Sequence, residues 1–196
     1  MQKLKQYKVC RRLGVAIFEK CQSQKFTRTL TEKKGRPRKM STYGLQLLEK
    51  QKTRFTYGIR EGQLSKYVGE AISGSGNPVT KLYQALEMRL DNVVYRLGLA
   101  KTRRHGRQEV SHGHFLVNGK KVRVPSFETK IGDKISIRPG SLPTGNFSNL
   151  DKKLKEQNLP EWLEFDINSL EGRVKGKPLN KGGVFDLSVV LEFYSR

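Results

Sequence analysis

The sequence has few acidic residues for its length. Only 18 of its 196 residues are Asp or Glu, against 39 Lys or Arg, which leaves a formal net charge of +21. A compact protein with so much charge of one sign repels itself, so it is expected to bind something anionic. Nucleic acid is the leading class of partner for such a chain.

Long hydrophobic runs are also missing. No run approaches the roughly 18 apolar residues needed to span a bilayer, and the first residues, MQKLKQYKVCRRLG, lack the apolar segment of a secretory signal. A basic amphipathic helix that binds a membrane surface is the remaining membrane alternative. The charge is spread over many segments rather than along one such helix, so we expect no membrane partner.

Cysteine and histidine are scarce as well. Cys10 and Cys21 cannot form a disulfide framework and indicate a reducing compartment. The three histidines are His105, His112 and His114, and they lack the further ligands that zinc requires. No glycine-rich cofactor loop, P-loop or catalytic triad is evident. We therefore expect no catalytic residue, no metal and no cofactor.

The positive charge is concentrated in two parts of the chain. Residues 1–60 hold 17 basic and 3 acidic side chains, and residues 88–140 hold 12 and 4. Residues 141–196 balance at 8 of each. A polyanion is therefore expected to meet the first and middle thirds, while the last third is scaffold or a protein interface.

Helical periodicity dominates the first half. Ser41 or Thr42 can cap one helix, Asn77 can cap a helix that begins at Pro78, and Thr102 can cap a shorter one that ends at Gly113. The predicted helices cover residues 41–55, 61–72, 78–97 and 103–112. The basic, Gly- and Pro-containing residues 33–40 read as an extended arm or loop, with a disordered tail as the alternative.

A two-residue period follows. Residues 115–117 and 122–124 flank Asn118-Gly119, a strong hairpin signal. Further strands are predicted at 134–140, 163–167 and 184–194, with a glycine-rich loop around 172–183 and a helix at 148–158. The fold class is thus α+β.

Several basic residues have the spacing of phosphate contacts. Arg103, Arg104 and Arg107 would repel one another on a helix, and a phosphate backbone would reverse that effect. Lys120 and Lys121 follow the hairpin turn, and Arg123 continues the patch. Lys50, Lys52 and Arg54 on the helix at 41–55 could also face RNA. The alternative for each of these groups is an exposed, solvated surface.

Three motifs in order carry a family resemblance. These are STYGLQLLEKQKTRFTYGIREGQLSKYV, then MRLDNVVYRLGLAKTRR with VSHGHFLVNGKKVRVPSFETKIGDKISI, and last WLEFDINSLEGRV with VVLEFYSR. The chain resembles the family of small-ribosomal-subunit protein four from Cys10 onward. The resemblance implies a largely helical body with an inserted S-four RNA-binding module of two helices and a small antiparallel sheet, and a basic N-terminal arm.

Boundaries and function follow from the same resemblance. It implies an arm at 1–40, a helical body at 41–87, the module at 88–140 and a closing segment at 141–196 that packs on the body. Members are structural proteins that bind 16S-type ribosomal RNA early in assembly, at a helix junction of the 5′ domain. They help line the path by which messenger RNA enters, contribute to decoding accuracy, and contact small-subunit protein five, with protein three as a further neighbour.

The resemblance also implies site residues. His112, His114 and Asn118 match a stretch that contributes to RNA binding, and Arg11 and Arg12 match an Arg-Arg pair before a glycine. Arg36, Arg38 and Lys39 match a basic segment that approaches messenger RNA in the family. A contact of these residues with ribosomal RNA is an equally good alternative. Two positions depart from the family pattern: Gly106 replaces a small apolar residue and Glu109 an aliphatic one.

Some alternatives remain open at this point. An RNA-modifying enzyme, such as a pseudouridine synthase or methyltransferase, can carry the same module, and Arg89-Leu90-Asp91 mimics a synthase motif, although Asp91 lies at the start of the module. A DNA architectural protein is a third possibility.

Some family members hold zinc through four cysteines in the arm, and this chain has two. The match begins within ten residues of Met1, so we expect synthesis where the protein is used, in bacterial cytoplasm or in a mitochondrion or plastid that encodes it.

Overall fold

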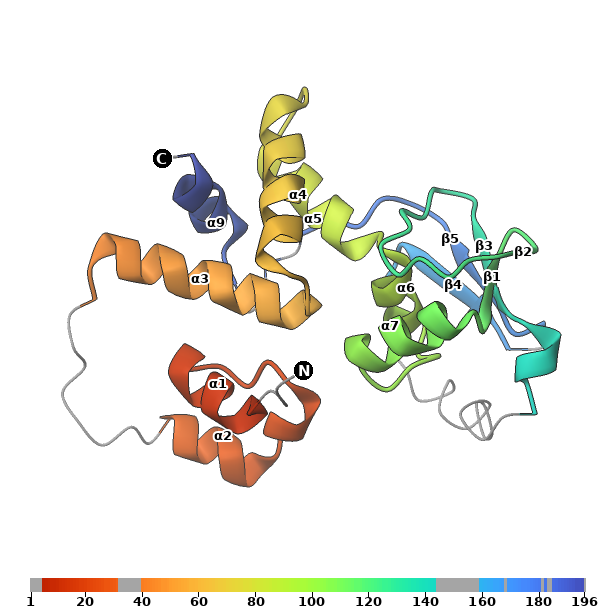
Figure 1. The fold of residues 1–196 in the computed structure, drawn as a ribbon, viewed down its shortest axis with the longest axis horizontal. Helices are drawn as coiled ribbons and strands as arrows, with labels where there is room; N and C mark the ends of the chain where they lie inside the picture. The colour runs from red at the N-terminus through yellow and green to blue at the C-terminus, as the bar shows by residue number, and fades with distance from the viewer. Residues whose placement is uncertain are drawn as a thin grey trace. The chain divides into compact units, whose positions relative to one another are not determined.

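The protein divides into two compact units. A computed structural model describes residues 5–31, 40–143, 159–167, 169–180, 182 and 185–195. Unit 1 comprises Met1–Leu82 with Asn180–Arg196, and unit 2 comprises Tyr83–Leu179. Both appear in Figure 1. Helices with a small antiparallel sheet make up the described residues, which confirms the α+β class.

The regular elements of unit 1 are all helices among its described residues. Its elements in chain order are α1 (Gln6–Leu13), the 3-10 turn η1 (Glu19–Cys21), α2 (Gln24–Thr31), α3 (Thr42–Tyr57), α4 (Glu61–Ser73), the first part of α5 (Pro78–Glu87), and α9 (Leu187–Tyr194). The predicted caps are confirmed: the Ser41 hydroxyl accepts from Gly44 N at 3.2 Å, and Asn77 Oδ1 accepts from Val79 N at 2.9 Å. The helices α1 and α2 lie within residues 1–40, where the resemblance predicts an arm.

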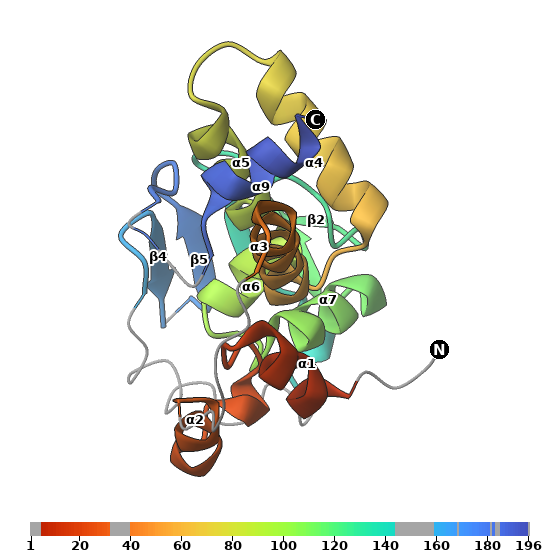
Figure 2. The ribbon, with the colours of Figure 1, turned by 90° about the vertical axis from the view of Figure 1, so that its left-hand side faces the viewer.

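The C-terminal helix closes unit 1. α9 packs against α3 and α4, and Figure 2 shows it beside α3. The prediction of a strand over 184–194 is wrong for the residues that form this helix. A short apolar run such as LSVVLEFY fits a buried helix as well as a strand. The Asp186 side chain, which accepts from Ser188 N at 2.9 Å, starts the helix, and contact with α3 and α4 fixes it.

Unit 2 places two helices on one face of a sheet. It contains α6 (Leu90–Arg96), α7 (Arg103–His112), β1 (Phe115–Val117), β2 (Lys120–Lys121), β3 (Lys134–Ile137), the 3-10 turn η2 (Pro139–Ser141), β4 (Leu163–Asp166) and β5 (Glu171–Val174). The strands are ordered β2-β1-β3-β5-β4 and all neighbours are antiparallel. The core of this unit joins apolar residues of α6 and α7 to the inner face of the sheet: Leu90, Val93, Val94, Leu97, Val110, Phe115, Val117, Ile135, Ile137 and Val174.

The predicted helix over 78–97 is interrupted. Arg89 has extended backbone angles and forms an isolated bridge with Glu128, and Thr129 N donates to Met88 O at 2.9 Å. This bridge divides the run into α5 and α6. Its partners are about forty residues away in the chain, so helical periodicity alone could not reveal the break.

The sheet also differs from its prediction. The Asn118-Gly119 turn is confirmed, with φ of 50° and 75°, but the second strand covers only β2 and not 122–124. β5 lies at the start of the stretch that was predicted to be a glycine-rich loop. Here Gly172 is needed for packing, since a Cβ on it would lie 2.4 Å from Leu97 Cδ1. The helix predicted at 148–158 lies outside the described residues.

Gly106 is a second glycine with a packing role. A Cβ there would lie 2.7 Å from the carbonyl oxygen of Asp91, on the neighbouring helix α6. We expect Gly106→Ala to destabilise unit 2 by about 1–3 kcal/mol through overpacking, although alanine is favoured over glycine in helices by about 1 kcal/mol. Gly69→Ala in α4, where nothing lies within 4 Å, should instead stabilise its helix. Native-state hydrogen exchange of each helix would measure both effects, and stabilisation of α7 by Gly106→Ala would contradict this view of the packing.

None of the described helices is long and apolar enough to cross a membrane.

Candidate nucleic-acid interface

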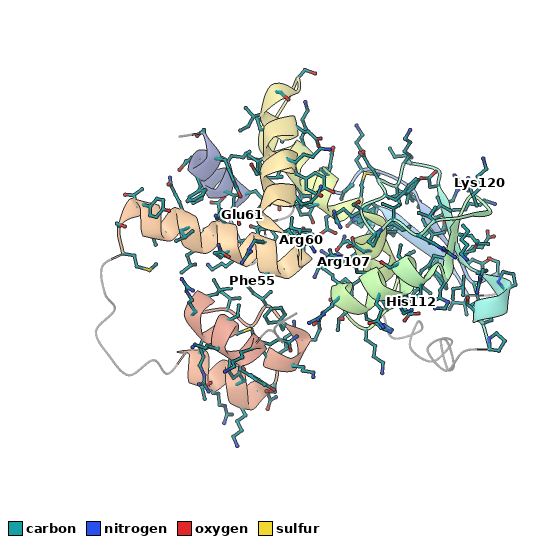
Figure 3. The ribbon with its side chains drawn as sticks, in the orientation of Figure 1. Phe55, Arg60, Glu61, Arg107, His112 and Lys120 are labelled. Carbon is teal, nitrogen blue, oxygen red and sulfur yellow. The ribbon has the colours of Figure 1, made fainter. Side chains whose placement is uncertain are left out.

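Two of the predicted RNA-binding arginines are engaged within unit 2. Arg107 donates from Nε and from a terminal nitrogen to Asp91 Oδ2, at 2.8 and 2.7 Å. Arg103 donates from Nε to Asn92 Oδ1 at 2.7 Å, and its guanidinium lies 4.6 Å from the centre of the Tyr95 ring. Arg104, between them, is exposed. Figure 3 shows Arg107 on α7.

The carboxylate partners of these arginines are buried. Asp91 is 2% exposed and also binds Arg89, which donates to its two oxygens at 3.0 and 2.9 Å. Asp91 is therefore a structural ion-pair centre, as its place at the start of the module suggested. Glu87, fully buried, lies 4.0 Å from a terminal nitrogen of Arg103 and accepts two bonds from Arg96, both at 2.9 Å.

This network explains how α7 tolerates its clustered cations. A phosphate from RNA was expected to neutralise the repulsion between Arg103 and Arg107. Carboxylates of α5 and α6 within unit 2 already do so. Those carboxylates lie more than ten residues earlier in the chain, so helical spacing within 103–107 could not predict them. Whether the two arginines also touch RNA stays a prediction.

The three cations predicted on α3 are also engaged within unit 1. Lys50 is 7% exposed and donates to Glu61 Oε1 at 2.5 Å, and its ammonium lies 4.5 Å from the centre of the Phe193 ring. Lys52 donates to Glu49 at 2.6 Å, and Arg54 donates to Gln51 at 3.0 Å. The structure does not test RNA contact by them, but it explains their positions by packing.

Glu61 supplies a pH-dependent contribution to unit 1. Partial burial acts to raise its pKa, but hydrogen bonds from Lys50 and Tyr194 outweigh burial and hold the pKa below the ordinary 4.5. A carboxyl group whose folded-state pKa is lowered stabilises the protein above its unfolded-state pKa, and this stabilisation disappears as pH falls through the folded-state value. Figure 3 shows Glu61 at the start of α4.

We expect Glu61→Gln to lower the stability of unit 1 at pH 7 by about 1 kcal/mol or less, because Glu61 is partly exposed. The difference from the unchanged protein should shrink as pH falls below the ordinary pKa of glutamate and through the lower folded-state pKa of Glu61. Thermal unfolding across a pH series measures it. Glu70→Gln, which removes an exposed partner of Lys66 on the same helix, is the control and should have a smaller effect. A pH-independent loss would show that the carboxylate charge is not the cause.

Three cations come together at the C-terminal end of α7. We call Lys121, Arg123 and Arg138 the α7-end cluster. Lys121 and Arg123 lie over Gly113, where an added Cβ would meet Lys121 Cε at 2.4 Å and Arg123 Nε at 3.2 Å. Two causes lower the pKa of Lys121. The larger is loss of hydration, and the smaller is repulsion by Arg123 and Arg138. Among the described residues, no carboxylate forms an ion pair with any of the three.

The cluster was only partly anticipated. Lys121 and Arg123 were identified from the hairpin, and Arg138 was missed because it lies one residue beyond β3. The two-residue period of that strand could have found it, since Lys134, Ser136 and Arg138 share one face. Lys120, labelled in Figure 3, is exposed beside the cluster at the hairpin.

The other predicted residues of the module have different surroundings. His112 is exposed, with its ring centre 5.9 Å from that of His114. His114 Nδ1 lies 2.9 Å from Ser141 Oγ. Asn118 joins the hairpin to β3: its side chain donates to Asp133 at 2.8 Å and accepts from Lys134 N at 2.9 Å.

A second cationic surface lies on α1. Lys8 and Arg12 are four residues apart on the helix, Arg11 is beside Arg12, and all three are exposed. The Arg11 guanidinium lies 5.9 Å from the centre of the Phe26 ring. α1 itself contains no acidic residue. The predicted contacts Arg36, Arg38 and Lys39 lie outside the described residues.

The two cysteines lie in one core cluster with Phe26. Cys10 and Cys21 are fully buried, and burial together with Cys10 raises the pKa of the Cys21 thiol to about 12. A structural zinc ion needs four ligands with the thiols deprotonated. Within the described ranges no three His, Cys, Asp or Glu side chains are placed to share a metal ion.

Comparisons with known proteins agree with this architecture. The family model described as "Ribosomal protein S4/S9 N-terminal domain" matches residues 2–87, and the S4 domain matches residues 88–135. The small ribosomal subunit protein uS4 of Sulfurihydrogenibium sp. is 44% identical over 194 residues, covering 96% of this chain and 95% of its own. Those of Heliobacterium modesticaldum and Aquifex aeolicus are each 42% identical, covering 96% of this chain and 96% and 95% of their own lengths.

These relatives are named as ribosomal proteins and not as enzymes. The predicted family resemblance and the prediction of a non-catalytic ribosomal protein are therefore confirmed. A modifying enzyme that carries the RNA-binding module would be similar to this chain over that module alone. The similarity to these relatives instead extends over nearly the whole chain. The chain belongs to the family of small ribosomal subunit protein uS4.

Proposed function

We propose that this protein binds 16S-type ribosomal RNA early in small-subunit assembly and holds a helix junction of the 5′ domain. Through the family resemblance it also lines the path of incoming messenger RNA, contributes to decoding accuracy, and contacts small-subunit proteins five and three. Its place of action is a bacterial ribosome, with an organellar ribosome as the alternative.

The α7-end cluster carries the proposal. Arg103 and Arg107 have internal carboxylate or amide partners, whereas Lys121 is repelled by Arg123 and Arg138. Phosphate oxygens would convert that repulsion into charge-assisted hydrogen bonds. Such contacts position a protein on RNA by shape and backbone rather than by base sequence.

The exposed cations of α1 support a second contact on unit 1. Lys8, Arg11 and Arg12 sit close together on one short helix with no acidic residue in it. We propose that Arg104 and Lys120 add to the surface of the module, and His112 adds a polar group. Arg36, Arg38 and Lys39 remain proposed contacts of the arm, to messenger or ribosomal RNA.

The test is the salt dependence of binding to a 5′-domain RNA. Each neutralised phosphate contributes about −0.7 to −0.9 to the slope of log affinity against log salt. A steep slope is expected, together with a preference for the RNA over duplex DNA in competition. A nearly flat plot, or equal competition by DNA, would refute the proposal.

A further inference from the structure

An acidic side chain is bound to the hairpin that carries two of the proposed RNA contacts, Lys120 and Lys121. Asp133 ends the turn that precedes β3, and its backbone N donates to Lys130 O at 3.1 Å. Its side-chain Oδ1 accepts from Asn118 Nδ2 at 2.8 Å, and its Oδ2 accepts from Lys130 N at 2.7 Å. The carboxylate therefore joins the β1–β2 turn to the turn before β3.

Asn118 completes this connection from the side of the hairpin. Its Oδ1 accepts from Lys134 N, and its backbone N donates to Lys134 O, both at 2.9 Å. We call the contacts of Asn118 with Asp133 and Lys134 the hairpin clamp. The turn before β3 is itself attached to β5, because Gly132 N donates to Val174 O at 2.8 Å and Val174 N donates to Asp133 O at 3.1 Å. The clamp thus attaches the tip of the hairpin to the middle of the sheet.

The outer strand of this hairpin is short. β2 is an edge strand of two residues, and both of them, Lys120 and Lys121, are exposed. Among the described strands it pairs with β1 alone, through Leu116 with Lys121 and Val117 with Lys120. An isolated two-stranded hairpin is at best marginally stable in water. A second attachment at the turn is therefore important for how firmly the two lysines are held.

We propose that Asp133 is a positioning residue for RNA binding, which holds Lys120 and Lys121 in place through Asn118. This inference rests on the proposed function of the module. A strand that carries lysines loses conformational freedom when it binds a phosphate backbone, and prior attachment of the strand reduces that loss. Asn118 contributes to RNA binding by fixing the hairpin to β3.

The sign of the effect separates positioning from net charge. Removing the Asp133 carboxylate makes the protein more positive, so electrostatics alone predicts tighter RNA binding. Asp133→Ala is instead expected to weaken binding of the full-length protein to a 5′-domain RNA about three- to tenfold. Asp133→Asn removes the same charge but keeps one acceptor oxygen, so it should lose less affinity. Glu128→Ala, which removes an exposed carboxylate of the same module, is the charge control and should bind equally or more tightly.

Asn118→Gly tests the other side of the clamp. Asn118 has a φ of 50°, which glycine adopts without strain, so the turn is kept while the side-chain hydrogen bonds are lost. This variant should weaken binding as Asp133→Ala does. Combining the two substitutions should add little to the loss, because both break the same connection.

A background without the two lysines separates positioning from a general loss of folding. In the double variant Lys120→Ala, Lys121→Ala, the further change Asp133→Ala should cause no additional loss of affinity, since it acts through these lysines. Unfolding of unit 2 would weaken binding in either background. Urea unfolding followed by the fluorescence of Trp162, which packs against the core of unit 2, checks that each variant is folded under the binding conditions.

The results that overturn the inference are specific. They are unchanged or tighter binding by either Asp133→Ala or Asn118→Gly, the same loss from Asp133→Ala with and without the two lysines, or a loss in Glu128→Ala as large as that in Asp133→Ala. Failure of the proposed function is recognised separately. In that case the unchanged protein would bind RNA without salt dependence, and the double variant Lys120→Ala, Lys121→Ala would have no effect.

Discussion

Replacing Asp91 by alanine is expected to lower the free energy of unfolding of unit 2 by about 3–5 kcal/mol. Asp91 accepts hydrogen bonds from Arg89 and Arg107, and its side chain and that of Arg89 are almost completely buried. Removing the carboxylate would take away the two hydrogen bonds that Asp91 accepts from the buried Arg89. The effect is large because the substitution breaks an existing buried ion pair. The contribution of the intact pair to the free energy of unfolding is smaller.

Urea unfolding followed by tryptophan fluorescence measures this effect. Trp162 is the only tryptophan and packs against the core of unit 2, so its signal reports that unit. Glu128→Ala removes an exposed carboxylate from the same unit and is expected to change stability by less than about 0.5 kcal/mol. If Asp91→Ala and Glu128→Ala had similar small effects, the ion-pair network would not be what holds α6 to α7.

Removing the α7-end cluster should produce the largest loss of RNA binding. The triple variant Lys121→Ala, Arg123→Ala, Arg138→Ala is expected to reduce the magnitude of the log–log salt slope by about 2, because each phosphate contact contributes about 0.7–0.9. Affinity near 0.1 M salt should fall on the order of 10- to 100-fold. Filter binding or calorimetry across a salt series with a 5′-domain RNA provides both quantities.

A charge-matched control distinguishes the cluster from net charge. Three other lysines are each paired with a carboxylate. The ammonium nitrogen lies 3.7 Å from Glu70 in Lys66, 3.9 Å from Glu171 in Lys134 and 3.1 Å from Glu164 in Lys175. Replacing these three by alanine removes the same number of positive charges. It should lower affinity far less, with little change in slope. Equal losses in the two triple variants would show that total charge, and not the arrangement at the end of α7, governs binding.

Local signals in the sequence predicted much of the fold. Ser41, Asn77 and Thr102 begin helices as expected, because a side-chain oxygen at a helix start satisfies nearby backbone amides whatever the rest of the fold. Asn118 and Gly119 form the predicted tight turn for a similarly local reason. The break at Arg89 and the strand around Gly172 were missed, because each depends on a partner far away in the chain.

The sequence by itself determined that this protein is a basic, α+β, non-catalytic relative of a ribosomal protein, because charge, capping and motif order are properties of the chain. Only the tertiary structure decided how individual charges are used. It pairs Arg107 with Asp91 and places Lys50 beside Glu61, and it leaves Lys121, Arg123 and Arg138 together without a carboxylate among the described residues. The reason is that an ion pair depends on distance in space, and these partners come from different helices and strands.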